Sequence, residues 1–234
     1  RIDLRRLPAR AGGGAAADGA PMRATLDRVQ VTDGIALTGL RGEFTSRGGF
    51  GGTFTGRVNG GAAVRGTVAP MKGGSGIRIT SDDAGGVIAS AGIFENARGG
   101  ALDLQLVPVG ANSYDGIATA RNFRVTNAPV LAELLSAISV VGILEQLNGA
   151  GLVFAEADAQ FRLTPAGVEV SRGAAVGASM GVSAAGTFDS RNKRLNLQGV
   201  ISPIYLLNGI GSVLTRKGEG LFGFNYHIRG TSDR

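Results

Sequence analysis

Hydrophobic and polar residues alternate along most of this chain, in short segments separated by glycine. In the segment 101–107, for example, three leucines alternate with an aspartate and a glutamine. Alternation of this kind places successive side chains on opposite faces of a β-strand, so that one face is apolar and the other is hydrated. The pattern predicts about a dozen strands. Their expected ranges are 22–31, 35–44, 53–58, 63–68, 76–80, 101–107, 116–125, 153–163, 168–172, 178–188, 194–201 and 221–229.

The segment 153–163 carries the longest alternation and predicts which side chains share a face of the sheet. Its small and apolar residues fall on one side, and its charged and amide residues fall on the other. The expected apolar side consists of Ala155, Ala157, Ala159, Phe161 and Leu163. No strand–helix–strand alternation occurs along the chain, so a parallel doubly wound sheet is not expected.

Three apolar stretches break the alternation and predict short helices near 82–92, 128–147 and 203–214. Pro129 suits a first helical turn, and apolar residues then recur at helical spacing up to the stop signal Asn148-Gly149. These helices are interrupted and shorter than the ~20 apolar residues of a membrane span. Their apolar side chains either cover a protein core or contact a membrane. The candidate contact residues are Val130, Leu131, Leu134, Leu135, Ile143, Leu144, Leu147, Ile204, Leu206 and Leu207.

The composition points to an aliphatic, glycine-rich protein. The chain of 234 residues has 40 glycines, one histidine, no cysteine and no tryptophan, and 6% of its residues are aromatic. Without cysteine, disulfides and thiolate metal sites are excluded. A formal charge of +6 favours anionic partners such as lipid headgroups or nucleic acid. The arginines are scattered and are not interleaved with aromatic residues, which argues against nucleic acid.

The search for catalytic chemistry finds little. No Walker A motif is present, and the glycine clusters at 48–52 and 209–211 do not complete a G-x-G-x-x-G motif. Asp82 and Asp83 follow Ser81 and could form a metal or acid–base site, but a helix cap explains them better. His227 could act as a general base, but it lacks a neighbouring acid or nucleophile in the sequence. We therefore expect a protein that is not an enzyme and holds no metal or cofactor.

The apolar strand faces outnumber the helices that could cover them. The sheet could close on itself as a sandwich, giving a structural or interaction domain with a dry core. It could instead form an open groove that acyl chains cover, because a large bare apolar surface marks a binding site. A membrane barrel is disfavoured by the scarcity of aromatic residues. The groove residues expected from the alternation are Phe44, Phe54, Val58, Val64, Val68, Ile77, Ile79, Leu102, Leu104, Leu106, Phe161, Leu163, Val168, Val170, Leu195, Leu197, Phe222, Phe224, Tyr226 and Ile228.

Several ordered segments resemble a known family. They are RGGALDLQL (98–106), NFRVTNAPVLAELLS (122–136), GAGLVFAEADAQFRL (149–163), LNLQGVISPIYLLNGIGSVL (195–214) and GEGLFGFNYHIRG (218–230). Together they resemble the C-terminal region of AsmA-like proteins of the YhdP type. The resemblance implies a repeating β-groove that moves phospholipid between the inner and outer membranes of a Gram-negative cell and supports outer-membrane integrity. It implies no catalytic residues.

The same resemblance sets expectations for partners, location and domain organisation. The groove would lie in the periplasm, with an inner-membrane anchor upstream and its C-terminal end near the outer membrane or outer-membrane proteins. The chain begins at Arg1 without an initiator methionine, so we expect a piece of a longer protein. Residues 1–80 would form a β-meander with a flexible loop at 9–21, and residues 81–234 the AsmA-like C-terminal region. The expected fold is mainly β: a long, curled, taco-like antiparallel sheet with about three or four short apolar helices.

Overall fold

The alternating segments form one antiparallel sheet. The computed structural model describes residues 2–3, 21–32, 34–110, 112–138, 141–189, 192, 194–203 and 223–231. Its strands are β1 (Ile2–Asp3), β2 (Met22–Gln30), β3 (Ala36–Thr45), β4 (Gly51–Val58), β5 (Ala63–Met71), β6 (Gly74–Ser81), β7 (Ala97–Arg98), β8 (Ala101–Gly110), β9 (Ser113–Val125), β10 (Leu152–Thr164), β11 (Gly167–Gly177), β12 (Gly181–Asp189), β13 (Arg194–Ser202) and β14 (Phe224–Thr231). Its helices are α1 (Ala84–Ser90), α2 (Pro129–Ala137) and α3 (Val141–Asn148).

The strands follow one another across the sheet in chain order. Each strand from β2 onward pairs antiparallel with the next, except that β6 pairs with β8 and the short β7 pairs with β9. Only β1 and β2 pair in parallel among the described strands. Consecutive strands can pair antiparallel because the turns between them are tight. In the turn between β4 and β5, Asn59 and Gly60 adopt left-handed φ angles of 48° and 81°, which suit a tight hairpin. The mainly β fold with an open antiparallel sheet is therefore confirmed.

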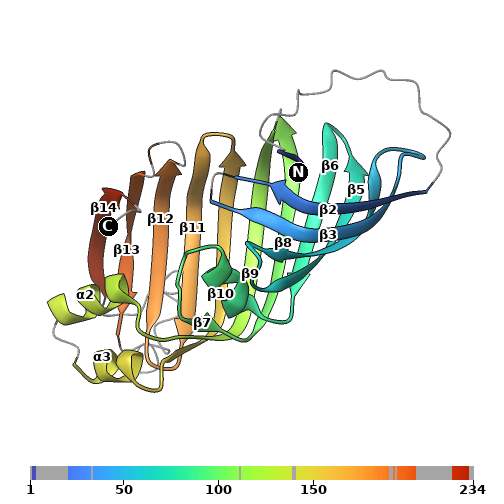
Figure 1. The fold of residues 1–234 in the computed structure, drawn as a ribbon. Coiled ribbons are helices and arrows are strands. Elements are labelled where there is room, and N and C mark those ends of the chain that lie inside the picture. The colour runs from blue at the N-terminus through green and yellow to red at the C-terminus, as the bar shows by residue number, and fades with distance from the viewer. Residues whose placement is uncertain are drawn as a thin grey trace.

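The sheet is curled rather than flat. Figure 1 shows β9–β14 side by side, while β2 and β3 run across their direction at the other end of the sheet. Irregular pairing contributes to this curvature, because a β-bulge bends its strand and increases the local twist. One bulge lies in β3 between Thr38 and Arg41, beside Gly39, whose φ is 57°.

A bulge in β10 corrects one prediction for the apolar side. The pairing of β10 with β11 shifts between Phe154 and Glu156. As a result Ala155 is exposed, whereas Phe154 is buried and stacks on Phe123 at a centroid distance of 5.4 Å. Simple alternation fails here because the extra residue reverses the faces of the side chains that precede it.

The expected helices near 82–92 and 128–147 are confirmed as α1 and as the pair α2 and α3. Pro129 occupies the first turn of α2. The helix expected near 203–214 lies outside the described residues apart from Pro203, and the loop at 9–21 lies outside them apart from Pro21. None of the helices within the described ranges has the length and apolar character needed to cross a membrane.

Two clusters of buried side chains stabilise the fold. One joins α2 and α3 to the ends of β9, β10 and β13, with Leu135, Leu147 and Leu152 almost fully buried. The other lies among β2–β6 and includes Val58 and Val64. Val87 and Ala91, in and just after α1, pack against this second cluster.

Candidate functional site

One face of the sheet carries the apolar residues of nearly every strand. Residues paired across neighbouring strands project to the same side. Leu104 lies opposite Ile79 and Ala118, and Leu197 lies opposite Gly186 and Ile228. We call this side the apolar face. The predicted groove residues that the strand register brings together on it are Phe44, Phe54, Val58, Val64, Val68, Ile77, Ile79, Leu102, Leu104, Leu106, Phe161, Leu163, Val168, Val170, Leu195, Leu197, Phe224, Tyr226 and Ile228.

Phe222, the remaining predicted groove residue, lies outside the described residues.

The apolar face is sealed in its N-terminal half. Val64 is 2% exposed, Val58 6% and Phe54 8%, and they belong to one buried cluster. The curl of β2–β5 and the side chains of α1 bring apolar groups against this part of the face. These predicted groove residues therefore form a core rather than an accessible groove.

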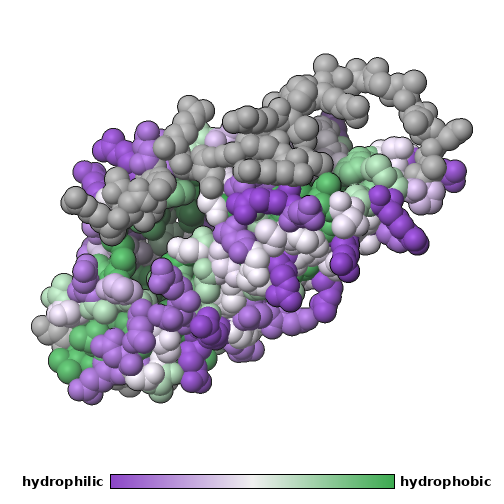
Figure 2. Space-filling model, in the orientation of Figure 1, coloured by the Kyte–Doolittle hydropathy of each residue, from purple (hydrophilic) through white to green (hydrophobic). Residues whose placement is uncertain are grey.

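The apolar face is more open in its C-terminal half. Phe161, Val170, Leu197 and Ile228 are half-buried, and Phe224 is 45% exposed. Figure 2 shows a hollow with hydrophobic side chains over the C-terminal strands. This half therefore presents aliphatic side chains that the described helices do not fully cover.

Glycines on the apolar face lie beneath aromatic rings of the neighbouring strand. Gly66 is paired with Phe54, and Gly116 is paired with Phe161. A Cβ atom at either glycine would collide with the paired ring. Glycine suits these positions because the neighbouring ring occupies the space that a side chain would need. Sequence analysis missed these pairs, although the glycines occupy the positions where alternation expects an apolar residue.

Alanines line the centre of the same face. Ala118 and Ala120 of β9 lie opposite Ala159 and Ala157 of β10. Their short side chains leave more room above the sheet than leucine would. The middle of the apolar face is therefore lower than the strands on either side.

The apolar residues of α2 and α3 mostly face the sheet. Leu131 and Ile143 are less than 10% exposed, and Leu135 and Leu147 are fully buried. Leu134 and Leu144 are half-buried and pack against the same cluster. The sequence left two roles open for these residues, covering a protein core or contacting a membrane. Their burial supports the first role.

Some apolar side chains of the described residues are nevertheless exposed to solvent. Val130 is 50% exposed, Val141 61% and Ile93 64%. Ile204, Leu206 and Leu207 lie outside the described residues.

The paired acids Asp82 and Asp83 make hydrogen bonds and an ion pair with neighbouring groups. The Asp83 Oδ1 accepts hydrogen bonds from the backbone N–H of Gly86 and of Gly99, each at 2.8 Å. The Asp82 carboxylate pairs with the Arg65 guanidinium at 2.9 Å. The helix cap that the sequence predicts is confirmed. No group of three potential metal ligands is found within the described part of the chain.

The titratable ring residues near the C-terminus lie on opposite faces. His227 is exposed beside Asn196, with 2.6 Å between its Nε2 and the Asn196 Oδ1. Tyr226 lies on the apolar face, and its hydroxyl donates to the Ser183 carbonyl oxygen at 2.7 Å. Burial raises the pKa of the Tyr226 hydroxyl above its ordinary value of 10.0. The tyrosine therefore stays neutral on a face that carries apolar groups.

Comparison with protein-family models, with curated proteins and with solved structures finds no significant match for this chain.

Proposed function

We propose that this protein binds phospholipid through the C-terminal half of its apolar face. The observation that carries the proposal is a row of half-buried aliphatic side chains on one side of an open sheet, including Val170, Leu197 and Ile228. Acyl chains suit such a surface because they need no directional contacts. Each methylene removed from water contributes ~0.8 kcal/mol.

The wider role is lipid conduction by an AsmA-like module. In this proposal the protein belongs to a periplasmic bridge that is anchored in the inner membrane upstream and delivers phospholipid toward the outer membrane. The simple strand order supports it, because a meander can be lengthened at either edge by more strands of the same type. Its partners would be acyl chains, the membrane surface or outer-membrane proteins, and the sheet segments that precede it.

A site-specific photocrosslinker tests the proposal at neighbouring residues on opposite faces. Leu104 and Leu197 are half-buried on the apolar face, and the adjacent Gln105 and Gln198 are exposed on the polar face. The protein is expressed in a Gram-negative host, irradiated in cells and purified. We expect phospholipid adducts by mass spectrometry at the two leucine positions and none at the two glutamine positions.

Two results would reject lipid binding. One is the absence of adducts at both leucine positions together with no phospholipid in the unirradiated protein. The other is equal labelling of both faces, which would indicate non-specific contact with membrane.

The second candidate is a structural or interaction domain with a closed core. The burial of Val58, Val64 and Phe54 favours it, because the N-terminal half of the apolar face is already sealed without a ligand. This candidate would be supported over the first if the protein is purified without bound phospholipid and if a delipidation step leaves its stability unchanged.

A further inference from the structure

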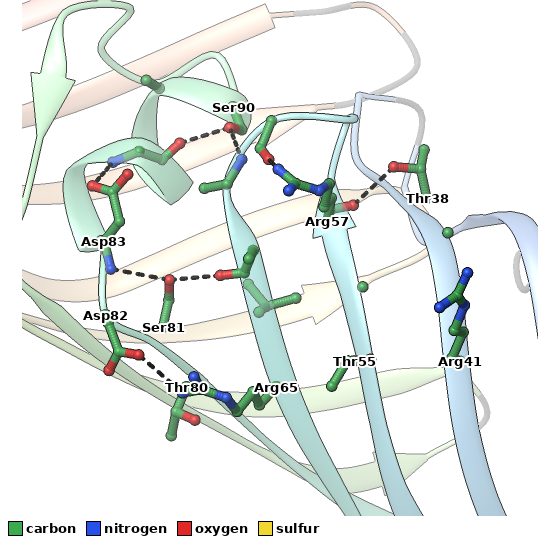
Figure 3. A pocket seen from close by; sticks show the side chains of 18 of the residues that line it. Thr38, Arg41, Thr55, Arg57, Arg65, Thr80, Ser81, Asp82, Asp83 and Ser90 are labelled. Atoms are coloured by element: carbon green, nitrogen blue, oxygen red, sulfur yellow. Dashed lines mark hydrogen bonds and ion pairs between the residues drawn. The ribbon is translucent and has the colours of Figure 1, made fainter.

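A hollow of about 980 Å³ lies against the strands β3–β6, α1 and the end of β7. Figure 3 shows arginine and threonine side chains gathered along these strands, with Asp82, Asp83 and Ser90 at one side. Thr55 and Arg57 alternate along β4 with the buried Phe54 and Val58. The side chains that project into the hollow from the strands therefore belong to the polar face. The hollow is separate from the lipid site proposed above, and it is open to solvent.

The strand register gathers three arginines around one threonine. Thr55 lies opposite Arg41 on β3 and opposite Arg65 on β5. Arg57 follows two residues later on β4, so its side chain projects to the same face. All three arginines are exposed. We call this group, with the hollow that it lines, the arginine hollow.

The positive charge of the arginine hollow is only partly balanced. Four arginines and two aspartates line it. Asp82 is paired with Arg65, and the Asp83 carboxylate caps backbone N–H groups. Among the described residues neither acid contacts Arg41 or Arg57, so these two guanidinium groups lack a carboxylate partner there.

The free donors of the arginine hollow suit an anion with several oxygens. Arg57 uses its Nη1 to donate to the Gly61 carbonyl oxygen at 2.8 Å, and its remaining N–H groups have no partner within the described ranges. Arg41 has no hydrogen-bond partner there either. A guanidinium presents N–H groups in a planar fork that matches the oxygens of phosphate. The Thr55 hydroxyl between them offers another donor.

We propose that the arginine hollow binds the phosphate group of a small phosphate ester, with Arg41 and Arg57 as its main ligands. The ester could be a soluble metabolite or the headgroup of a phospholipid, because both present the same phosphate chemistry. The proposal does not depend on lipid binding by the apolar face, since the two sites lie on different faces of the sheet.

Calorimetric titration tests the proposal with two soluble probes and one membrane probe. The probes are inorganic phosphate, glycerol 3-phosphate and vesicles of phosphatidylglycerol, with phosphatidylcholine vesicles as a reference. We compare the wild type with the double variant R41Q/R57Q. A control variant, R172Q/R194Q, removes the same charge from exposed positions on β11 and β13.

We expect saturable binding of the glycerol 3-phosphate or of the phosphatidylglycerol vesicles, weakened about tenfold for each charged hydrogen-bond donor that is removed. The control variant should bind within about twofold of the wild type. Both variants lose the same net charge, so a larger loss in R41Q/R57Q must come from the local arginine donors and not from general electrostatic attraction. Preference for the soluble ester identifies a metabolite, and preference for the vesicles identifies a headgroup. Both results support the proposed site.

A second variant keeps the arginines and blocks the space between them. T55W places a large side chain on an exposed position and should abolish binding while circular dichroism stays that of the wild type. The proposal is overturned if no probe binds saturably. It is also overturned if R41Q/R57Q and R172Q/R194Q weaken binding equally, or if an oligonucleotide binds more tightly than the ester.

Discussion

Substitution of Gly85 by alanine should destabilise the protein, although Gly85 lies within a helix. The glycine is buried in the first turn of α1. Its N–H donates to the Gly99 carbonyl oxygen at 2.8 Å, which holds the helix against the chain around β7. A Cβ atom on Gly85 would lie 2.5 Å from the Arg98 Cα and closer still to the Arg98 backbone nitrogen. The obstacle is backbone, so a rotamer change cannot relieve the collision.

Two opposing terms set the size of the effect. Alanine is favoured over glycine in a helix interior by about 1 kcal/mol. Overpacking costs about 1–3 kcal/mol, and the upper value applies here because hydrogen-bonded backbone must move. The net loss is then about 2 kcal/mol, which lowers the melting temperature by roughly 4–8 °C for a chain of this size.

Gly142 provides a matched control. It lies in α3 and is exposed, and a Cβ atom built on it meets no atom within 4 Å. Alanine at this position should therefore stabilise the protein by about 0.5–1 kcal/mol through helix propensity alone. Urea denaturation followed by circular dichroism measures both variants. A gain in stability for G85A similar to that of G142A would refute the close packing of α1 on β7.

Three further predictions concern burial and pH. Replacing the fully buried Leu147 by alanine should cost about 2–5 kcal/mol in urea denaturation, whereas V141A, at a position 61% exposed, should change stability by less than about 0.5 kcal/mol. The hydrogen bond from Arg78 lowers the pKa of Asp103 below 3.8, so its stabilisation is present above that pH and lost as the pH falls through the lowered pKa; D103N should show a weaker acid dependence of melting temperature. The pKa of Tyr226 is raised above 10.0, so its contribution is present below that pH and lost as the pH rises through the raised pKa; Y226F should show a smaller alkaline decline in melting temperature.

Local patterns in the sequence predict the elements of this fold well. Alternation identifies the strands and their apolar sides, because a strand with one buried face carries that period in its residues. The cap at Asp83 and the helix start at Pro129 are predicted for the same reason, since each depends on residues a few positions apart. Alternation fails at Ala155, where one inserted residue changes the face and nothing in the composition marks it.

Features that depend on several strands at once escape sequence reasoning. Arg41, Arg57 and Arg65 appear scattered along the chain, and only the register of three strands brings them around Thr55. The pairing of Gly116 with Phe161 is likewise set by the register, although the two residues are far apart in sequence. A one-residue shift in pairing would abolish either arrangement.

Curvature explains why one residue pattern gives two different surfaces. The same alternation runs through both halves of the sheet, yet Val64 is 2% exposed while Leu197 is half-buried. Where β2–β5 curl, apolar side chains contact one another and form a core. Where β9–β14 lie side by side, the same type of side chain stays partly uncovered (Figure 1). Because twist and bulges arise from the pairing of strands rather than from hydrophobicity, accessibility of the apolar face is a property of the assembled sheet. The proposed lipid binding should therefore concentrate on the C-terminal strands, and a crosslinker at Val64 should capture far less lipid than one at Leu197.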